Sequence, residues 1–242
     1  MKKTIKTIKT IVKKIPIDFT KNQKYDTLTK KIMRIVLEKD SSFVDIGCHK
    51  GEVLREAMKF APNGFHFGFE PIPALYQQLI IDFGKNCDIR QVGLSNIRGV
   101  STFNYVKTNP AYSGIKKRTY PRKESIEEIS INLDTLDNQL FDATRIDFIK
   151  IDVEGGELNV LRGGVNIIMK FNPVIVFEYG LGASEFYDAM PKEMWSFFDE
   201  VKYSIYTLKN FIESPSPISL IEFEEIFNTN KEYYFVARFR SS

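Results

Sequence analysis

The sequence of 242 residues has few of the side chains that build metal centres and disulfide frameworks. It contains two cysteines, Cys48 and Cys87, and two histidines, His49 and His66. Two cysteines provide no disulfide framework, so we expect both to be reduced thiols. So few histidines argue against a multi-histidine zinc centre. We therefore expect no resident metal site built from these side chains.

The chain also lacks a continuous apolar run of the roughly 20 residues that a membrane-spanning helix needs. Its start has no continuous apolar segment of the kind found in a signal peptide. We therefore expect a cytoplasmic protein, and contact with the inner face of the membrane stays open. The formal net charge of +3 is well short of the dense basic surface of a nucleic-acid binder, so we expect no nucleic-acid partner.

Composition predicts one full α/β domain, because 43% of the residues are hydrophobic and 27% are charged. We assign residues 1–40 to a helical extension and residues 41–242 to the domain. Isoleucines at helical spacing, separated by lysines, predict a basic amphipathic helix over residues 1–15. Such a helix packs on its own domain or on a partner subunit, or it binds an anionic membrane surface. The pattern does not determine the oligomeric state.

Residues 43–60 predict a buried strand, a tight turn and a helix that begins at Glu52. Gly47 and Gly51 can adopt positive φ and let a ligand approach the backbone. His49 stands where a dinucleotide-binding turn has its middle glycine. Asp45 would repel a pyrophosphate but can order a turn that faces a cationic amino-acid ligand. These features favour S-adenosylmethionine over NAD, and an NAD-dependent oxidoreductase remains the alternative.

Polar side chains at the ends of the next two predicted strands complete the expected cofactor site. The strand at residues 65–70 ends on Glu70, which is placed to accept hydrogen bonds from ribose hydroxyls. Pro71 suits the first turn of the following helix. The third strand, expected over residues 89–94, is followed by Ser95, where the adenine would lie.

Charged residues cluster around residues 147–157, Asp-Phe-Ile-Lys-Ile-Asp-Val-Glu-Gly-Gly-Glu. On a strand, alternate residues share one side, so three of these charges would point the same way. Three charges on one side of a strand are expected where the end of the strand opens onto a ligand site. A charged cluster that only caps the end of the strand is the alternative interpretation. Another apolar strand, residues 173–179, also delivers a carboxylate. The candidate catalytic residues are Lys150, Asp152, Glu154, Glu157 and Glu178.

The segment 107–124 is polar, punctuated by glycine and proline, and basic. Loops of this length are usually functional lids or disordered, and we expect a cover over the acceptor. Asn109, Tyr112 and Ser113 are the candidate acceptor-binding residues, since they offer a stacking ring and hydrogen bonds. The basic run 116–118 could meet a phosphate. A plain solvated loop is the alternative.

The rest of the chain predicts further strands. Residues 100–106 suggest an extra edge strand, and residues 129–136 a short strand and turn. Residues 202–208 and 232–240 are expected to complete the sheet, with the last strand returning antiparallel at the edge.

Three stretches together resemble the FkbM family of S-adenosylmethionine-dependent methyltransferases. They are residues 44–51 (VDIGCHKG), 69–71 (FEP) and 147–157 (DFIKIDVEGGE), and the resemblance covers roughly residues 43–182. It implies a Rossmann-like class I methyltransferase domain, with a seven-stranded, mostly parallel sheet, an antiparallel last strand and helices on both faces. It also implies O-methylation of hydroxyls, commonly on sugars or polyketide-like products. His49 departs from the asparagine usual at that turn.

Methyl transfer from a sulfonium is an in-line displacement, and a hydroxyl acceptor must also lose its proton. We rank Asp152 and Glu154 first as the base, with Asp152 also close to the cofactor. Mg²⁺ held by clustered carboxylates is the alternative activator. We expect a sugar or glycan-precursor acceptor. A protein, a nucleic acid or another small molecule as acceptor, or a binding module without activity, are the rivals.

Overall fold

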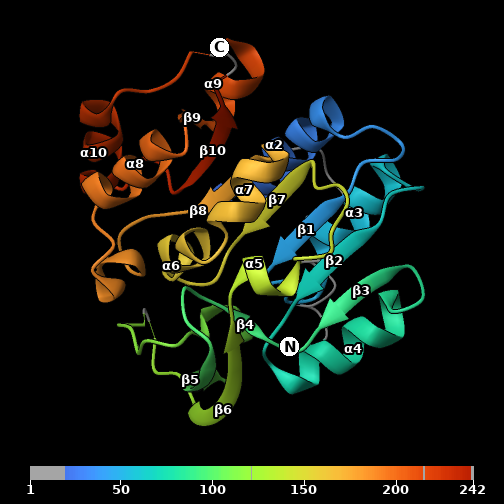
Figure 1. The fold of residues 1–242 in the computed structure, drawn as a ribbon. Helices are drawn as coiled ribbons and strands as arrows, with labels where there is room; N and C mark the ends of the chain where they lie inside the picture. Colours follow the sequence, from blue (N-terminus) through green and yellow to red (C-terminus); the bar gives the residue numbers. More distant parts are fainter. Residues whose placement is uncertain (1–19, 121, 215, 241–242) are drawn as a thin grey trace.

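The computed structural model describes residues 20–120, 122–214 and 216–240 (Figure 1). The predicted amphipathic helix of residues 1–15 lies outside the described residues, so its contact with a membrane or a partner stays a prediction. Within the described ranges, no helix combines the length and apolar character needed to cross a bilayer.

A seven-stranded sheet forms the centre of the fold, in the order β3-β2-β1-β7-β8-β10-β9 (Figure 1). All its pairings are parallel except those of β10, which runs antiparallel to both neighbours. The expected fold class is therefore confirmed. The strands are β1 (Phe43–Ile46), β2 (His66–Phe69), β3 (Cys87–Arg90), β7 (Phe148–Ile151), β8 (Val174–Glu178), β9 (Tyr203–Thr207) and β10 (Tyr234–Phe239).

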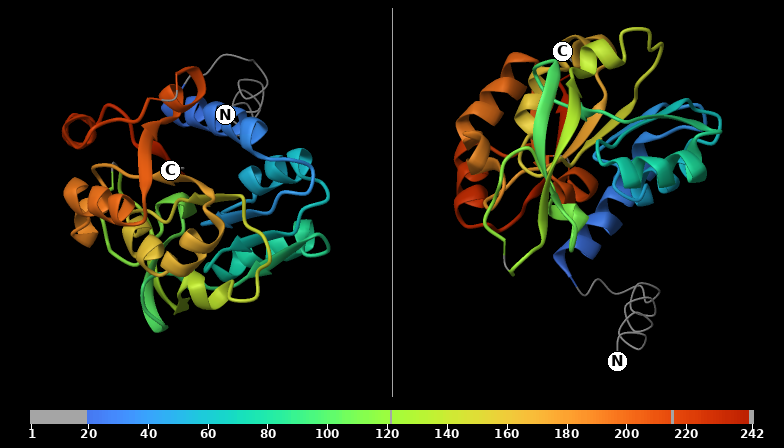
Figure 2. Two further views of the ribbon diagram at one scale, coloured as in Figure 1. Left: turned by 45° about the horizontal axis from the view of Figure 1, so that its top comes forward. Right: turned by 90° about the horizontal axis from the view of Figure 1, so that it is seen from below.

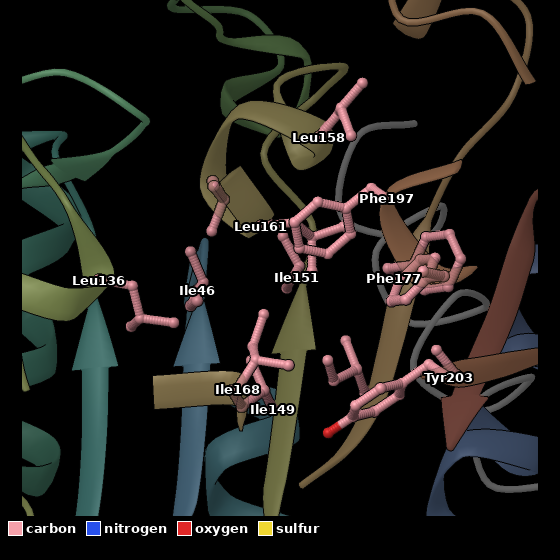
Figure 3. Close-up of a cluster of buried hydrophobic side chains, with 14 of the residues drawn as sticks. Ile46, Leu136, Ile149, Ile151, Leu158, Leu161, Ile168, Phe177, Phe197 and Tyr203 are labelled. Atoms are coloured by element: carbon pink, nitrogen blue, oxygen red, sulfur yellow. The ribbon is translucent and has the colours of Figure 1, made fainter. Parts of the chain in front are cut away.

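Helices cover both faces of this sheet, as expected. Side chains alternate along each strand, so Ile46 of β1 faces one layer and Phe43 the other. Figure 3 shows Ile46 and Phe177 meeting helix residues such as Leu161 on the first face. The helices on that face are α5 (Leu136–Gln139), α6 (Glu157–Arg162), α7 (Val165–Phe171), α8 (Pro191–Glu200) and α10 (Leu220–Asn228). Those on the other face are α2 (Lys21–Val36), α3 (Glu52–Phe60), α4 (Pro73–Phe83) and α9 (Leu208–Glu213).

Local sequence signals explain where several helices begin. Thr20 and Gln23 form a capping box at the start of α2, and Ser219 and Glu222 form another at the start of α10. Helix α3 spans the predicted residues. Helix α4 begins at Pro73, so the expectation that Pro71 lies in its first turn is wrong.

The start of α4 is delayed because of a local hydrogen bond. Residue Ile72 is extended, and its N–H donates to the Glu70 carboxylate at 2.9 Å. Pro73 then occupies the first helical position, where a missing N–H costs nothing. Pro71 therefore lies in the connection between β2 and α4.

A second, three-stranded sheet lies below the carboxyl ends of β1 and β2 in Figure 1, in the order β4-β6-β5. Its strands are β4 (Gly93–Leu94), β5 (Gly99–Val106) and β6 (Ile126–Asp134). This corrects two expectations. The third strand does not run continuously over residues 89–94, because Gly93 and Leu94 pair with β6 instead. Residues 99–106 pair with β6 as well and are not an edge of the central sheet.

The last strand is antiparallel as expected but does not lie at the edge. Strand β10 is inserted between β8 and β9, and β9 forms the edge. The physical reason is burial, since Phe235, Val236 and Ala237 are fully buried and need neighbours on both sides. The long connection after β9 carries α9 and α10. Figure 2 shows α2 beside this C-terminal part, where Tyr25 donates a hydrogen bond to Glu232.

The central position of β10 predicts a large effect of truncating Phe235. Its ring contacts Phe177 and Phe223, with centroids 5.8 Å and 4.9 Å away. We expect Phe235→Ala to lower the free energy of unfolding by about 3–5 kcal/mol, because it empties a packed core. Denaturant unfolding measures this change. Ile221→Ala, at a side chain that is 76% exposed on α10, is the control and should change it by less than about 0.5 kcal/mol. Equal small effects of both variants would contradict a central β10.

Candidate active site

An inner cavity of about 210 Å³ opens at the carboxyl ends of β1, β2 and β7. Its walls come from the turn after β1 (47–50), the segment after β2 (70–72) and the segment after β7 (152–154). Open α/β sheets place their ligands at this end of the strands. The inner cavity is therefore the first candidate for a cofactor site.

The two glycines of the turn after β1 are required for different reasons. Gly47 has φ of +81°, and a Cβ there would lie 1.9 Å from the carbonyl oxygen of Asp152. This glycine lets the ends of β1 and β7 approach each other, and it lines the inner cavity. Gly51 has φ of +69°, but a Cβ there would lie 2.4 Å from the ring of Phe83. Gly51 therefore permits packing of the turn on α4 and does not line the cavity.

Glu70 connects the turn after β1 to the segment after β2 at the wall of the inner cavity. Its carboxylate accepts hydrogen bonds from the N–H of His49 at 2.8 Å and of Ile72 at 2.9 Å. Burial raises the pKa of Glu70 to about 7, although these two N–H groups oppose the rise. Pro71 and the His49 side chain also line the cavity. The His49 Nε2 has no hydrogen-bond partner among the described residues.

Asp45 does not line the inner cavity, because its side chain is only 1% exposed beneath the turn. It lies opposite Lys150 in the pairing of β1 with β7, and the Lys150 Nζ is 3.8 Å from its Oδ1. Burial raises the pKa of Asp45 to about 6, and the Lys150 charge opposes the rise. Burial lowers the pKa of Lys150, but the carboxylates of Asp152 and Asp45 raise it above its usual value. Asp45 thus contributes to the site through Lys150.

A smaller cavity of about 40 Å³ lies beside the inner cavity. Both cavities are lined by Gly47, Pro71, Phe103 and Val153. The remaining wall is largely apolar and includes Ser95, the residue that sequence analysis placed beside an adenine.

An outer cavity of about 470 Å³ lies on the other side of Asp152 and Glu154, which line both it and the inner cavity. Its wall combines residues far apart in the sequence: the 107–124 loop, the end of β8, β10 and the start of α2. Figure 2 shows how α2 and the C-terminal part come side by side. Besides Asp152 and Glu154, polar and aromatic residues in the wall include Asn22, Tyr112, Arg118, Tyr120, Glu157, Glu178, Asn230, Tyr233 and Tyr234.

Asp152 follows the last residue of β7 and is held by three partners. Tyr234 Oη donates to its Oδ2 at 2.6 Å, and Lys150 Nζ lies 3.1 Å from the same oxygen. Glu178 donates a third hydrogen bond. Burial would raise the pKa of Asp152, but the Lys150 charge and these hydrogen bonds hold it below its usual value. Asp152 is therefore ionised at neutral pH.

Glu154 does not belong to the strand, contrary to the alternation that placed Lys150, Asp152 and Glu154 on one side of it. Strand β7 ends at Ile151, and Glu154 has φ of +63°. In this turn its carboxylate meets Arg118 Nη2 at 2.6 Å. Burial and the charge of Asp152 raise the pKa of Glu154 to about 8 against the opposing charge of Arg118.

Burial also raises the pKa of the other two carboxyls. Burial, followed by the nearby Asp152, raises the pKa of Glu178 well above its usual value. Burial raises the pKa of Glu157 to about 7, although the N–H groups of Val153 and Gly155 donate to its Oε1 at 3.0 Å and 3.1 Å. Of these four clustered carboxyls, Asp152 is the one whose pKa is held below its usual value.

The three candidate acceptor residues of the loop have different positions. Tyr112 lines the outer cavity and stacks on Tyr120, with ring centroids 6.2 Å apart. Ser113 is buried, and its Oγ accepts a hydrogen bond from the Val106 N–H at 2.9 Å. Asn109 precedes the short helical turn Pro110–Tyr112 and lines none of the three cavities described above.

Sequence analysis missed Tyr234 and Tyr120. Tyr234 reaches Asp152 only because β10 pairs with β8 in a register that sets Tyr234 opposite Glu178. No local motif signals that register. Tyr120 could have been found from its proximity in sequence to Tyr112, since both lie in the loop that was expected to contact the acceptor.

Residues 45–205, more than half of the chain, match the family model of the methyltransferase FkbM domain. The chain belongs to the FkbM methyltransferase family. It therefore carries an S-adenosylmethionine-dependent methyltransferase domain, as its three sequence stretches implied. No curated protein matches it in sequence.

Several solved structures are similar to this FkbM domain at low sequence identity. The FkbM methyltransferase of Methylobacillus flagellatus is 17% identical, with a TM-score of 0.49, 70% of this chain covered and 40% of that one. The chain thus spans less than half of that protein. The precorrin-6y C5,15-methyltransferase of Geobacter metallireducens is 13% identical, with a TM-score of 0.48 and coverage of 90% and 89%. Aeropyrum pernix fibrillarin, with natively bound S-adenosyl-L-methionine, is 12% identical, with a TM-score of 0.43 and coverage of 88% and 74%.

The cavities of the FkbM domain fit the cofactor that its family uses. The small apolar cavity with Ser95 at its wall suits the adenine ring. Glu70 lines the inner cavity with a carboxylate that can accept from ribose hydroxyls. The ionised Asp152, at the far side of the same cavity, offers a counter-charge to the positively charged sulfonium. These residues would hold S-adenosylmethionine.

The buried carboxyl of Glu157 predicts a pH-dependent stability. Because its pKa rises from 4.5 to about 7 on folding, the native state binds more protons than the unfolded state between these values. Its stabilising contribution is fully present below pH 4.5 and is lost as the pH rises through 7. We expect Glu157→Gln, whose Oε1 still accepts from both N–H groups, to exceed the wild type in stability by up to about 3 kcal/mol at pH 8.5. At pH 4 the two should be nearly equal.

Denaturant unfolding of both proteins at the two pH values checks this expectation. Asp142→Asn, at an exposed position outside the site, is the control and should follow the wild type at both. An equal difference between Glu157→Gln and the wild type at pH 4 and pH 8.5 would show that the Glu157 carboxyl does not titrate as described.

Proposed function

We propose that this FkbM domain is an O-methyltransferase that methylates a hydroxyl of a sugar or glycan precursor with the help of a carboxylate. One observation carries the proposal: Asp152 and Glu154 line both the cavity that fits S-adenosylmethionine and the outer cavity. A group transferred from one cavity to the other passes these two side chains. In-line displacement requires donor and acceptor to meet from opposite sides in this way.

The protonation states assign different roles to the two carboxyls. Asp152, ionised and oriented by Tyr234 and Lys150, is ready to accept the proton of an acceptor hydroxyl. Glu154, with its pKa raised to about 8, bears the proton more often and can donate a hydrogen bond to the acceptor. S-adenosylmethionine, when bound, supplies the methyl group. Asp152 then holds the proton at its carboxylate.

The wall of the outer cavity supports a carbohydrate acceptor. Tyr112, Tyr120 and Tyr233 offer aromatic surface that a sugar can contact, and Asn22 and Asn230 offer amides that both donate and accept hydrogen bonds. Sugars need both kinds of contact, because their hydroxyls donate and accept while their ring C–H faces are apolar. A protein or another small molecule as acceptor is the alternative.

Labelled S-adenosylmethionine tests the acceptor class. The purified enzyme is incubated with protein, nucleic-acid and carbohydrate fractions from a strain that lacks the gene, and the label in each fraction is counted. The proposal expects label in the carbohydrate fraction. Label confined to the protein, to the nucleic acid or to another small molecule would overturn it.

Neutralising the two shared carboxyls should abolish turnover but retain the cofactor. We expect Asp152→Asn and Glu154→Gln to lower the rate of methyl transfer about 10²-fold to 10⁴-fold, the size usual for general acid–base catalysis. Calorimetry should find nearly unchanged affinity for S-adenosylhomocysteine. Asp142→Asn serves again as the control. Wild-type rates in both variants would place the base elsewhere, with Glu157 and Glu178 next.

A divalent cation is the alternative activator for the same carboxyls. Asp152, Glu154 and Glu178 each present an oxygen within 4.8 Å of the others, and carboxylate oxygens are ligands that Mg²⁺ accepts. Treatment with a chelator separates the two mechanisms. The carboxylate mechanism expects an unchanged rate, whereas loss of activity that Mg²⁺ restores would assign these side chains to a metal.

A further inference from the structure

Arg118, in the wall of the outer cavity, has an unused hydrogen-bond donor. Its side chain is 8% exposed, and two of its nitrogens are engaged: Nη2 with Glu154 at 2.6 Å and Nη1 with the carbonyl oxygen of Gly182 at 3.3 Å. Its Nε is buried and has no hydrogen-bond partner among the described residues. A guanidinium N–H can only donate, so this nitrogen requires an oxygen acceptor.

Tyr120 presents a second unused group in the same wall. Its Oη is buried and likewise has no hydrogen-bond partner within the described part of the chain. The ring is held by stacking on Tyr112, over which the Arg118 guanidinium also lies, 5.7 Å from the ring centroid. Buried polar groups are rarely left unpaired, so two unpaired groups in the wall of one cavity point to a ligand. The ligand must offer oxygens.

The charges around the outer cavity decide what kind of oxygen fits. Four carboxyls line the cavity, those of Asp152, Glu154, Glu157 and Glu178, whereas Arg118 is the single cation among the described residues of its wall. Both terminal nitrogens of Arg118 are engaged, by the Glu154 carboxyl at 2.6 Å and by the Gly182 carbonyl oxygen at 3.3 Å. Arg118 therefore offers a ligand the single donor Nε and not the paired donors that hold a carboxylate or a phosphate. An anion that entered would also face the ionised Asp152. An uncharged oxygen is not repelled by the Asp152 carboxylate.

We propose that the outer cavity selects an uncharged polyol as acceptor, whose oxygens are held by Arg118 Nε and Tyr120 Oη, and rejects acidic sugars and phosphate groups there. This inference rests on the proposed function and narrows its acceptor class. It also revises the expectation that the basic run 116–118 meets a phosphate. Lys116 and Lys117 are exposed, whereas Arg118 points into the carboxyl cluster.

Binding of a matched pair of sugars tests whether the outer cavity selects uncharged ligands, and it requires no turnover. Methyl α-glucoside and methyl α-glucuronide differ in one group, a hydroxymethyl against a carboxylate. Saturation-transfer NMR is recorded for each at equal concentration with enzyme saturated by S-adenosylhomocysteine. We expect magnetisation transfer to the glucoside and none to the glucuronide. Equal or stronger transfer to the glucuronide, or transfer to neither sugar, would overturn the proposal.

Two variants test the named donors. Tyr120→Phe removes the hydroxyl and keeps the ring, and Arg118→Lys keeps the charge toward Glu154 and removes Nε. Each should weaken glucoside binding about fivefold to tenfold, the size of one hydrogen bond, with unchanged affinity for S-adenosylhomocysteine. Tyr105→Phe, outside the cavity, is the matched control. If Arg118→Lys does not fold, Tyr120→Phe alone tests the proposal. Wild-type affinity of Tyr120→Phe for the glucoside would then contradict the role of the two donors.

The proposed function and the selection for an uncharged polyol can be contradicted separately. If the wild type transfers no methyl label into the carbohydrate fraction, the proposed function is wrong, whatever the sugar pair shows. If label enters carbohydrate but the glucuronide binds as well as the glucoside, the function stands and the selection for an uncharged polyol is wrong.

Discussion

Keeping one carboxylate ionised between two cavities is the constraint on which the rest of this site depends. Burial alone would raise the pKa of Asp152, as it does for Glu154, Glu157 and Glu178. The charge of Lys150 and the hydroxyl of Tyr234 oppose that tendency. Lys150 is itself buried and is retained as a cation by Asp152 and by Asp45 on the adjacent strand. The ionised base is thus held by an ion-pair network that spans β1, β7 and β10.

This network explains why the sheet needs its inserted last strand. Lys150 and Asp45 meet because β1 and β7 are neighbours, and Gly47 lets the ends of those strands come together. Tyr234 reaches Asp152 because β10 lies against β8 and not at the sheet edge. Core packing and site electrostatics therefore depend on the same strand order. The raised pKa values of the surrounding carboxyls follow from this shared burial.

Sequence analysis predicted the elements determined by local patterns and missed those determined by distant pairing. Strand β1 and helix α3 were predicted closely, because apolar periodicity and Gly47 specify them locally. The separation of Gly93–Leu94 into a second sheet was not predicted, since it depends on pairing with β6. The roles of Tyr234 and Arg118 were also hidden, because each contacts a carboxyl dozens of residues away. Glu154 was misplaced because strand alternation stops at Ile151.

A crystal structure with S-adenosylhomocysteine tests the central claim, that Asp152 and Glu154 separate a cofactor cavity from an acceptor cavity. The account predicts adenine in the small cavity beside Phe103 and Ser95, ribose at Glu70, and the sulfur in the inner cavity facing Asp152 and the outer cavity beyond it. Adenosine bound in the outer cavity, among Tyr112 and its neighbouring tyrosines, would contradict it.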